Sequence, residues 1–166
     1  LIRNMGVSLI VSGSYLVNAE YMGAAMHRLR ISETSSHILV GDFMLGKEDL
    51  PVLDHAEAGL KEVLGVIDRH NMGFALLTGR GGRLEGLISN ADVRKSLLKR
   101  LPDLSGLNAG AMANRSPVTV SVNDTVEAML ARIKQQRFPV LFLPVVDEQN
   151  RLAGAVTFNN LIRGEA

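Results

Sequence analysis

The sequence contains no cysteine, which excludes a disulfide framework and thiolate chemistry. An excess of charge of either sign is also lacking, since 18 lysines and arginines face 17 aspartates and glutamates for a net charge of +1. A global field that attracts nucleic acid or an acidic membrane surface is therefore not expected, and neither is a nucleic-acid partner. Metal-ligand spacing is absent from the four histidines, which are His27, His37, His55 and His70.

Long hydrophobic runs are missing as well. The longest apolar stretch, residues 5–17, is interrupted by serine and glycine and is too short to cross a bilayer, so no membrane segment is predicted. It also lacks the basic start and the cleavage site of a signal peptide. These absences favour a cytoplasmic protein. Because the chain begins with Leu1, we expect it to be a piece of a longer protein whose partner activity lies upstream.

An internal repeat of about 60 residues is what the sequence does contain. Matching positions lie 66 residues apart in the first part of the repeat and 68 apart in the second part. The matches include Pro51 with Pro117, Leu64 with Leu130, Ile67 with Ile133 and Gly86 with Gly154. The second copy therefore gains two residues, and the segment 138–141 is the expected place.

Both copies show the same order of signals, which predicts a β-α-β-β-α unit. After a short extended piece come a helix, two strands joined by a turn, and a closing helix. The expected ranges are helices at 57–69 and 125–135, strands at 73–78, 84–88, 140–146 and 152–156, and closing helices at 91–100 and 159–163. A three-stranded sheet with both helices on one face leaves its other face uncovered, so the two units are expected to pack sheet to sheet.

The predicted fold class is thus α/β of the α+β kind, with an extra N-terminal segment. That segment, residues 1–37, carries an expected strand at 7–12 and an expected helix at 18–30, and it is either the end of an upstream domain or a dimer contact. The first unit is expected at 38–101 and the second at 102–166.

Three motifs give the chain a resemblance to a known family. The first copy reads Gly86-Leu87-Ile88-Ser89-Asn90-Ala91-Asp92, and the second reads Gly154-Ala155-Val156-Thr157-Phe158-Asn159-Asn160. The second copy also contains the strand sequence Leu143-Pro144-Val145-Val146-Asp147. These motifs resemble those of CBS domains, which occur in tandem as a Bateman module, and the resemblance covers about residues 38–164.

The resemblance implies clefts that hold the phosphate and ribose of an adenine nucleotide. Carried over by position, Ser89 and Asp92 would bind the ligand in the first copy, and Thr157 and Asn160 would line the second cleft. A hydroxyl at the start of a helix, with unpaired N–H groups beside it, suits a phosphate, and a carboxylate suits a ribose diol. Because Asn160 replaces the carboxylate, we expect one competent cleft, in the first copy.

Two further ligand candidates are Arg94 and Thr119. Arg94 belongs to a basic cluster that could steer an anion, and Thr119 lies in residues 112–120, which resemble the opening motif of CBS domains. Each candidate also has a purely structural interpretation. Ser89 and Thr157 can be helix N-caps, and Asp92 in a first helical turn complements the helix dipole without any ligand.

The expected function is a regulatory module that binds AMP, ADP, ATP, S-adenosylmethionine or a related anion and controls an attached or associated enzyme or transporter. No cofactor, metal or catalytic residue is expected, and the chain is not expected to be an enzyme. The alternative is a ligand-free dimerisation scaffold. A homodimer is expected in either case, through the apolar helix positions Leu60, Leu64 and Ile67.

Overall fold

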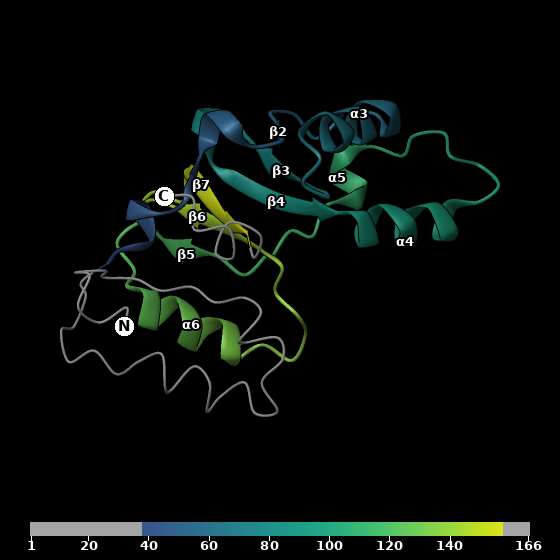
Figure 1. Ribbon diagram of the computed structural model, residues 1–166. Helices are drawn as coiled ribbons and strands as arrows, with labels where there is room; N and C mark the ends of the chain where they lie inside the picture. Colours follow the sequence, from purple (N-terminus) through teal and green to yellow (C-terminus); the bar gives the residue numbers. More distant parts are fainter. Residues whose placement is uncertain (1–37, 158–166) are drawn as a thin grey trace.

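The computed structural model describes residues 38–157 of the chain, and these form two sheets that face each other (Figure 1). The first sheet has the order β2-β3-β4 and the second the order β1-β7-β6-β5. The strands are β1 (Leu45–Gly46), β2 (Val52–Leu53), β3 (Phe74–Thr78), β4 (Leu84–Ser89), β5 (Val120–Ser121), β6 (Phe142–Val146) and β7 (Leu152–Thr157). The expected strand at 7–12 and the expected helices at 18–30 and 159–163 lie outside the described residues.

The helices are α3 (Leu60–His70), α4 (Asn90–Arg100), α5 (Ala109–Met112) and α6 (Val126–Lys134), with short 3-10 turns at Val40–Asp42, Lys47–Asp49 and Arg80–Gly82. Helices α3, α4 and α6 follow the predicted order, whereas α5 was not predicted. Helix α3 begins three residues later than expected because Ala58 is buried and Gly59 is extended, with φ −71° and ψ 167°. Strand β6 begins at Phe142 because its pairing with β7 starts at the pair Phe142–Thr157.

Helix α3 packs on its sheet through Val63, Val66 and Ile67, which are buried. Of the three positions expected at a dimer contact, Ile67 is thus taken up by the core of its own unit, while Leu64 is 42% exposed. The helix ends at Asn71, which adopts the left-handed conformation with φ 52° and whose N–H donates to the carbonyls of Ile67 and Asp68.

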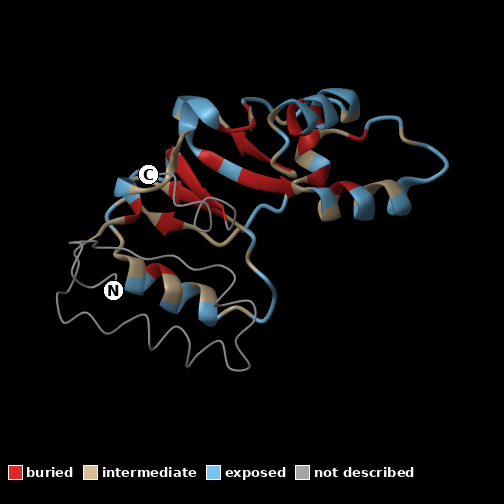
Figure 2. Cartoon of the chain, in the orientation of Figure 1, coloured by how far each residue is buried: buried red, intermediate tan, exposed pale blue. Residues whose placement is uncertain are grey.

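The two sheets pack face to face, as predicted. Their shared core contains Phe74, Leu76 and Leu87 from the first sheet and Leu152 and Ala155 from the second. The rings of Phe74 and Phe142 stack across this interface with centroids 4.5 Å apart. Figure 2 shows buried residues along the strands of both sheets. Burial between the sheets therefore holds the two units together.

Each unit also lends a segment to the other. Strand β1 pairs with β7, and Val40 belongs to the core of the second unit. In return, Ala109 and Met112 of α5 belong to the core of the first unit, and Asn114 forms a β-bridge with Leu87 of β4. The unit boundary at residue 101 remains a prediction, and these contacts cross it.

The sheet register aligns the two copies residue by residue. The strand pairs Leu53–Leu77 and Val120–Val145 occupy equivalent places in the two sheets. Two hydrogen bonds of 2.8 Å are also equivalent: the Ala109 N–H donates to the Ala58 carbonyl, and the Val40 N–H donates to the Asp124 carbonyl. Pro51 therefore lies level with Val118, and not with Pro117 as the sequence alignment has it, because the second copy has one residue fewer between its first strand and α6 than the first copy has between β2 and α3.

Candidate functional site

Ser89 and Asp92 lie where the repeat places them, at the junction of β4 and α4, and they bind each other. The Asp92 N–H donates to Ser89 Oγ at 3.2 Å, while Asp92 Oδ2 accepts from the Ser89 N–H at 2.9 Å and from its hydroxyl at 2.5 Å. This is a capping box, in which two backbone donors at the helix start are satisfied reciprocally. The structural interpretation of the two residues thus holds in this conformation, and their ligand contacts remain a prediction.

The cap leads to a stability prediction. Replacing Ser89 with Ala removes the acceptor for the Asp92 N–H, so we expect unfolding to cost about 1 kcal/mol less. Urea denaturation followed by circular dichroism measures this loss. Ser96→Ala, in the interior of the same helix, is the matched control and should cost nothing, since alanine is the better helix former. Equal stability of Ser89→Ala and the wild type would contradict the capping role.

The other predicted candidates are spread over the molecule. Arg94 is exposed on α4. Thr157 is buried at the end of β7, and Thr119 is half-buried just before β5. Asn160 lies outside the described residues. Since β5 runs parallel to β6 and β7 runs antiparallel to it, Thr119 and Thr157 belong to the same end of the second sheet.

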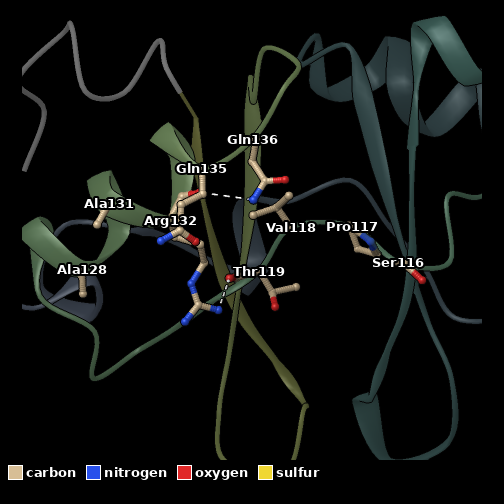
Figure 3. Close-up of a pocket in the computed structure, with 9 residues that line it drawn as sticks. All are labelled: Ser116, Pro117, Val118, Thr119, Ala128, Ala131, Arg132, Gln135 and Gln136. Atoms are coloured by element: carbon tan, nitrogen blue, oxygen red, sulfur yellow. Dashed lines mark hydrogen bonds between the residues drawn. The ribbon is translucent and has the colours of Figure 1, made fainter. Parts of the chain in front are cut away.

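A groove with a volume of about 470 Å³ opens at that end of the sheet, between α6 and the chain leading into β5. We call it the α6 groove (Figure 3). Its lining residues are Ser116, Pro117, Val118, Thr119, Ala128, Ala131, Arg132, Gln135 and Gln136. The volume lies in the range of small-molecule pockets. Of the six candidates, Thr119 lines this groove.

A proline beside the groove leaves one of its carbonyl groups without a sheet partner. In the first unit the Leu76 N–H donates to the Pro51 carbonyl at 2.8 Å. The register of the second unit places the nitrogen of Pro144 where the Leu76 nitrogen lies in the first unit, and this nitrogen has no hydrogen to donate to the Val118 carbonyl. The ladder between β5 and β6 therefore stops short, and the Val118 carbonyl is left as an acceptor at the wall of the groove.

Arg132 is the cation of the groove, and sequence reasoning missed it. Its Nη1 donates to the Thr119 carbonyl at 3.1 Å, and its Nη2 lies 4.0 Å from Asp124 Oδ2. Gln136 Nε2 donates to the Arg132 carbonyl at 3.2 Å, and Figure 3 shows both hydrogen bonds along one wall. A signal was present in the repeat, because Arg132 aligns with the apolar Val66 of the first copy.

A second hollow, of about 650 Å³, lies between the end of α3 and the start of α4. Leu64, Ile67, Met72 and Asn90 are among its lining residues. It sits beside the Ser89 cap, but the cap hydrogen bonds hold Ser89 and Asp92 to one another.

The perturbed titratable groups lie away from both hollows. His55 Nδ1 donates a hydrogen bond of 2.7 Å to the Asp54 carboxylate, which raises the pKa of the His55 imidazole and lowers the pKa of the Asp54 carboxyl. The Arg151 N–H and guanidinium likewise hold the pKa of Asp147 below its usual value. Within residues 38–157, no group of three histidine or acidic side chains could hold a metal ion.

Comparison with known proteins identifies the class. Residues 109–165 match the CBS domain family. The second unit is therefore a CBS domain, and the described chain has the fold of a tandem CBS domain pair, with two units packed sheet to sheet. None of the helices within the described residues is both long and apolar enough to span a bilayer.

The similar structures include CBSX2 from Arabidopsis thaliana, with a TM-score of 0.64 and 23% identity over 78% of this chain and 94% of that one. CBSX2 in complex with AMP gives the same TM-score at 24% identity, over 76% of this chain and 94% of that one. CbpB in complex with c-di-AMP has a TM-score of 0.63 and 16% identity, over 77% of this chain and 70% of that one.

A curated relative is L-aspartate semialdehyde sulfurtransferase from Methanocaldococcus jannaschii, which is 23% identical over 113 residues. The match takes in 68% of this chain, and the chain spans about a fifth (21%) of the length of that enzyme. The expectation that this chain is not itself an enzyme remains a prediction.

Proposed function

We propose that this chain is a regulatory module that binds an adenine nucleotide, or a related nucleotide-like anion, in the α6 groove. Occupancy of the groove would then control an attached or associated enzyme or transporter in the cytoplasm. The observation that carries the proposal is the groove itself, whose lining residues include a cation, Arg132, and Val118, whose carbonyl Pro144 cannot pair.

The groups of the groove match the chemistry of an adenine nucleotide. The exocyclic amino group of adenine is a donor and suits the Val118 carbonyl, which Pro144 cannot satisfy. The phosphate suits the guanidinium of Arg132, and the neutral amide of Gln136 can serve either end. The position of Thr157 at this end of the sheet agrees with the role that the family resemblance implies.

The comparisons support a ligand of this class. CBSX2 binds AMP and CbpB binds c-di-AMP, and both share the fold of this chain. Both ligands combine adenine, ribose and phosphate, which are the groups that the α6 groove can pair.

Isothermal titration of the chain with AMP, ADP, ATP, S-adenosylmethionine and a nucleotide sugar tests the proposal. We expect saturable binding of at least one adenine ligand at millimolar concentration or below. Pro144→Val restores the missing N–H without changing the groove wall, so the Val118 carbonyl gains a strand partner and the affinity for adenine ligands should fall. Absence of saturable binding by any of these ligands would reject the sensing role.

The cleft of the first unit is tested in the same titration. If Asp92 binds a ribose diol, as the resemblance implies, Asp92→Ala should weaken binding by about 1–3 kcal/mol. A 2′,3′-dideoxy analogue should then also bind more weakly than the parent nucleotide. Asp92→Ala with unchanged affinity would leave Asp92 as a capping residue only.

The scaffold reading is kept as a second candidate because apolar side chains stand exposed on the helices. Leu64 on α3 is 42% exposed and Leu98 on α4 is 69% exposed, and such side chains suit a second copy of the chain. The expected homodimer would appear in light scattering as twice the chain mass at tens of micromolar concentration. A monomer there would reject the homodimer, and a dimer that binds no ligand would favour the scaffold.

A further inference from the structure

The two units differ at one buried pair of positions, and the difference changes the chemistry of the groove. In the first unit Ala58 and Val66 are buried in the core, 1% and 8% exposed. At the aligned positions the second unit carries Asp124 and Arg132, whose side chains are 23% and 50% exposed. Two apolar core residues are thus replaced by one acid and one base.

This ion pair is not needed to attach the helix to its sheet. Helix α3 packs through Val63, Val66 and Ile67, all buried, with no charged group at the contact. Helix α6 packs through Met129, which is 1% exposed, and through Val126, Leu130 and Ile133. A half-exposed ion pair 4.0 Å long adds little stability. A structural role alone therefore does not account for Arg132.

The guanidinium of Arg132 keeps most of its hydrogen-bonding capacity. It has five N–H donors, and the described residues engage one of them through the Thr119 carbonyl at 3.1 Å. Asp124 Oδ2, the oxygen 4.0 Å from the guanidinium, also accepts from the Ser121 N–H at 2.8 Å. A planar fork of free donors at the wall of a groove matches the paired oxygens of a phosphate.

We infer that Arg132 is the specificity-determining residue of the module, and that it makes the α6 groove selective for the phosphorylated form of the ligand. The inference rests on the proposed function and deepens it. The nucleoside part is held by the backbone of residues 116–119, and the phosphate displaces Arg132 from the Thr119 carbonyl or adds to that contact. At the place of Arg132 the first unit presents the side chain of Val66.

The test compares AMP with adenosine on the wild-type chain and on Arg132→Met, which keeps an unbranched side chain and removes the charge. We expect the wild type to prefer AMP, and Arg132→Met to lose about tenfold or more in AMP affinity while its adenosine affinity stays the same. Arg132→Lys should keep part of the preference, because lysine retains the charge and loses the planar fork. Arg69→Met, an exposed arginine on α3, is the matched control and should change neither affinity.

Each outcome decides one proposal. If Arg132→Met binds AMP as the wild type does, the inference is overturned and the proposed function stands. If Arg132→Met binds AMP and adenosine with equally reduced affinity, Arg132 shapes the groove and does not bind the phosphate selectively, which also overturns the inference. If the wild type binds neither AMP nor adenosine, the inference is overturned, and the proposed function fails with it only when none of the ligands of the titration binds. Thermal unfolding of each variant shows that it is folded.

Discussion

Phe74→Ala should cost this chain about 3–5 kcal/mol of unfolding free energy. Phe74 is completely buried in β3, in the core that the two sheets share, and its ring stacks on Phe142 of the opposite sheet. The substitution removes the buried ring and leaves a cavity between the two sheets. It also removes the stacking contact with Phe142, and such contacts contribute about 0.5–1.5 kcal/mol. Urea denaturation monitored by circular dichroism measures the change in the unfolding free energy.

The chain supplies its own control for this substitution. Phe138 lies in the connection between α6 and β6 and is 58% exposed, so Phe138→Ala should change the stability by about 0.5 kcal/mol or less. Similar losses in the two variants would mean that the interface between the sheets is not the main core. A loss confined to Phe74→Ala is the expected result.

The sheet-to-sheet packing could be predicted because it follows from burial. Each copy has strands with too many apolar positions for one covered face, and Leu76 and Leu152 lie in the shared core as that argument requires. The two extra residues of the second copy also lie where they were expected, in the connection before β6, where Phe138 and Leu141 are exposed.

Other parts of the fold depend on contacts between distant segments, which a periodic pattern does not reveal. The pairing of β1 with β7 is an example, because Leu45 and Ala155 are remote in sequence and neither residue type specifies a partner. The late start of α3 has the same origin, since the Ala58 carbonyl is engaged by the Ala109 N–H. Tertiary hydrogen bonds fixed these details.

The ligand contacts of the candidate residues remain predictions. The helix start at Ser89 and Asp92 could be predicted from the motif, whereas the groove beside Thr119 is seen only in the structure. Arg132 was overlooked because a single arginine in an amphipathic helix looks like a solvated residue. Its meaning depends on Thr119, Asp124 and the missing N–H of Pro144, which come together only in the fold.

The glycine that opens the repeated signature, Gly86 in the first copy and Gly154 in the second, is needed for packing between the units, so a larger side chain there should strongly destabilise the chain. Gly154 lies in β7 where that strand pairs with β1. A Cβ there would overlap the Leu45 carbonyl oxygen and lie 2.6 Å from Met44 Sδ. At its counterpart Gly86 a Cβ would lie 2.9 Å from the Asn114 carbonyl oxygen. Each glycine therefore admits the segment that the other unit contributes.

Gly154→Val should accordingly destabilise the chain by about 3 kcal/mol, at the upper end of the cost of overpacking, because the Leu45 backbone must move and β1 must separate from β7. Gly65→Ala is the control, since Gly65 is exposed within α3 and a Cβ there meets nothing within 4 Å. That variant should gain up to about 1 kcal/mol from helix propensity. Hydrogen exchange should show faster exchange of the β7 amides in Gly154→Val than in the wild type. Unchanged exchange together with wild-type stability would mean that β1 does not lie on β7 in solution.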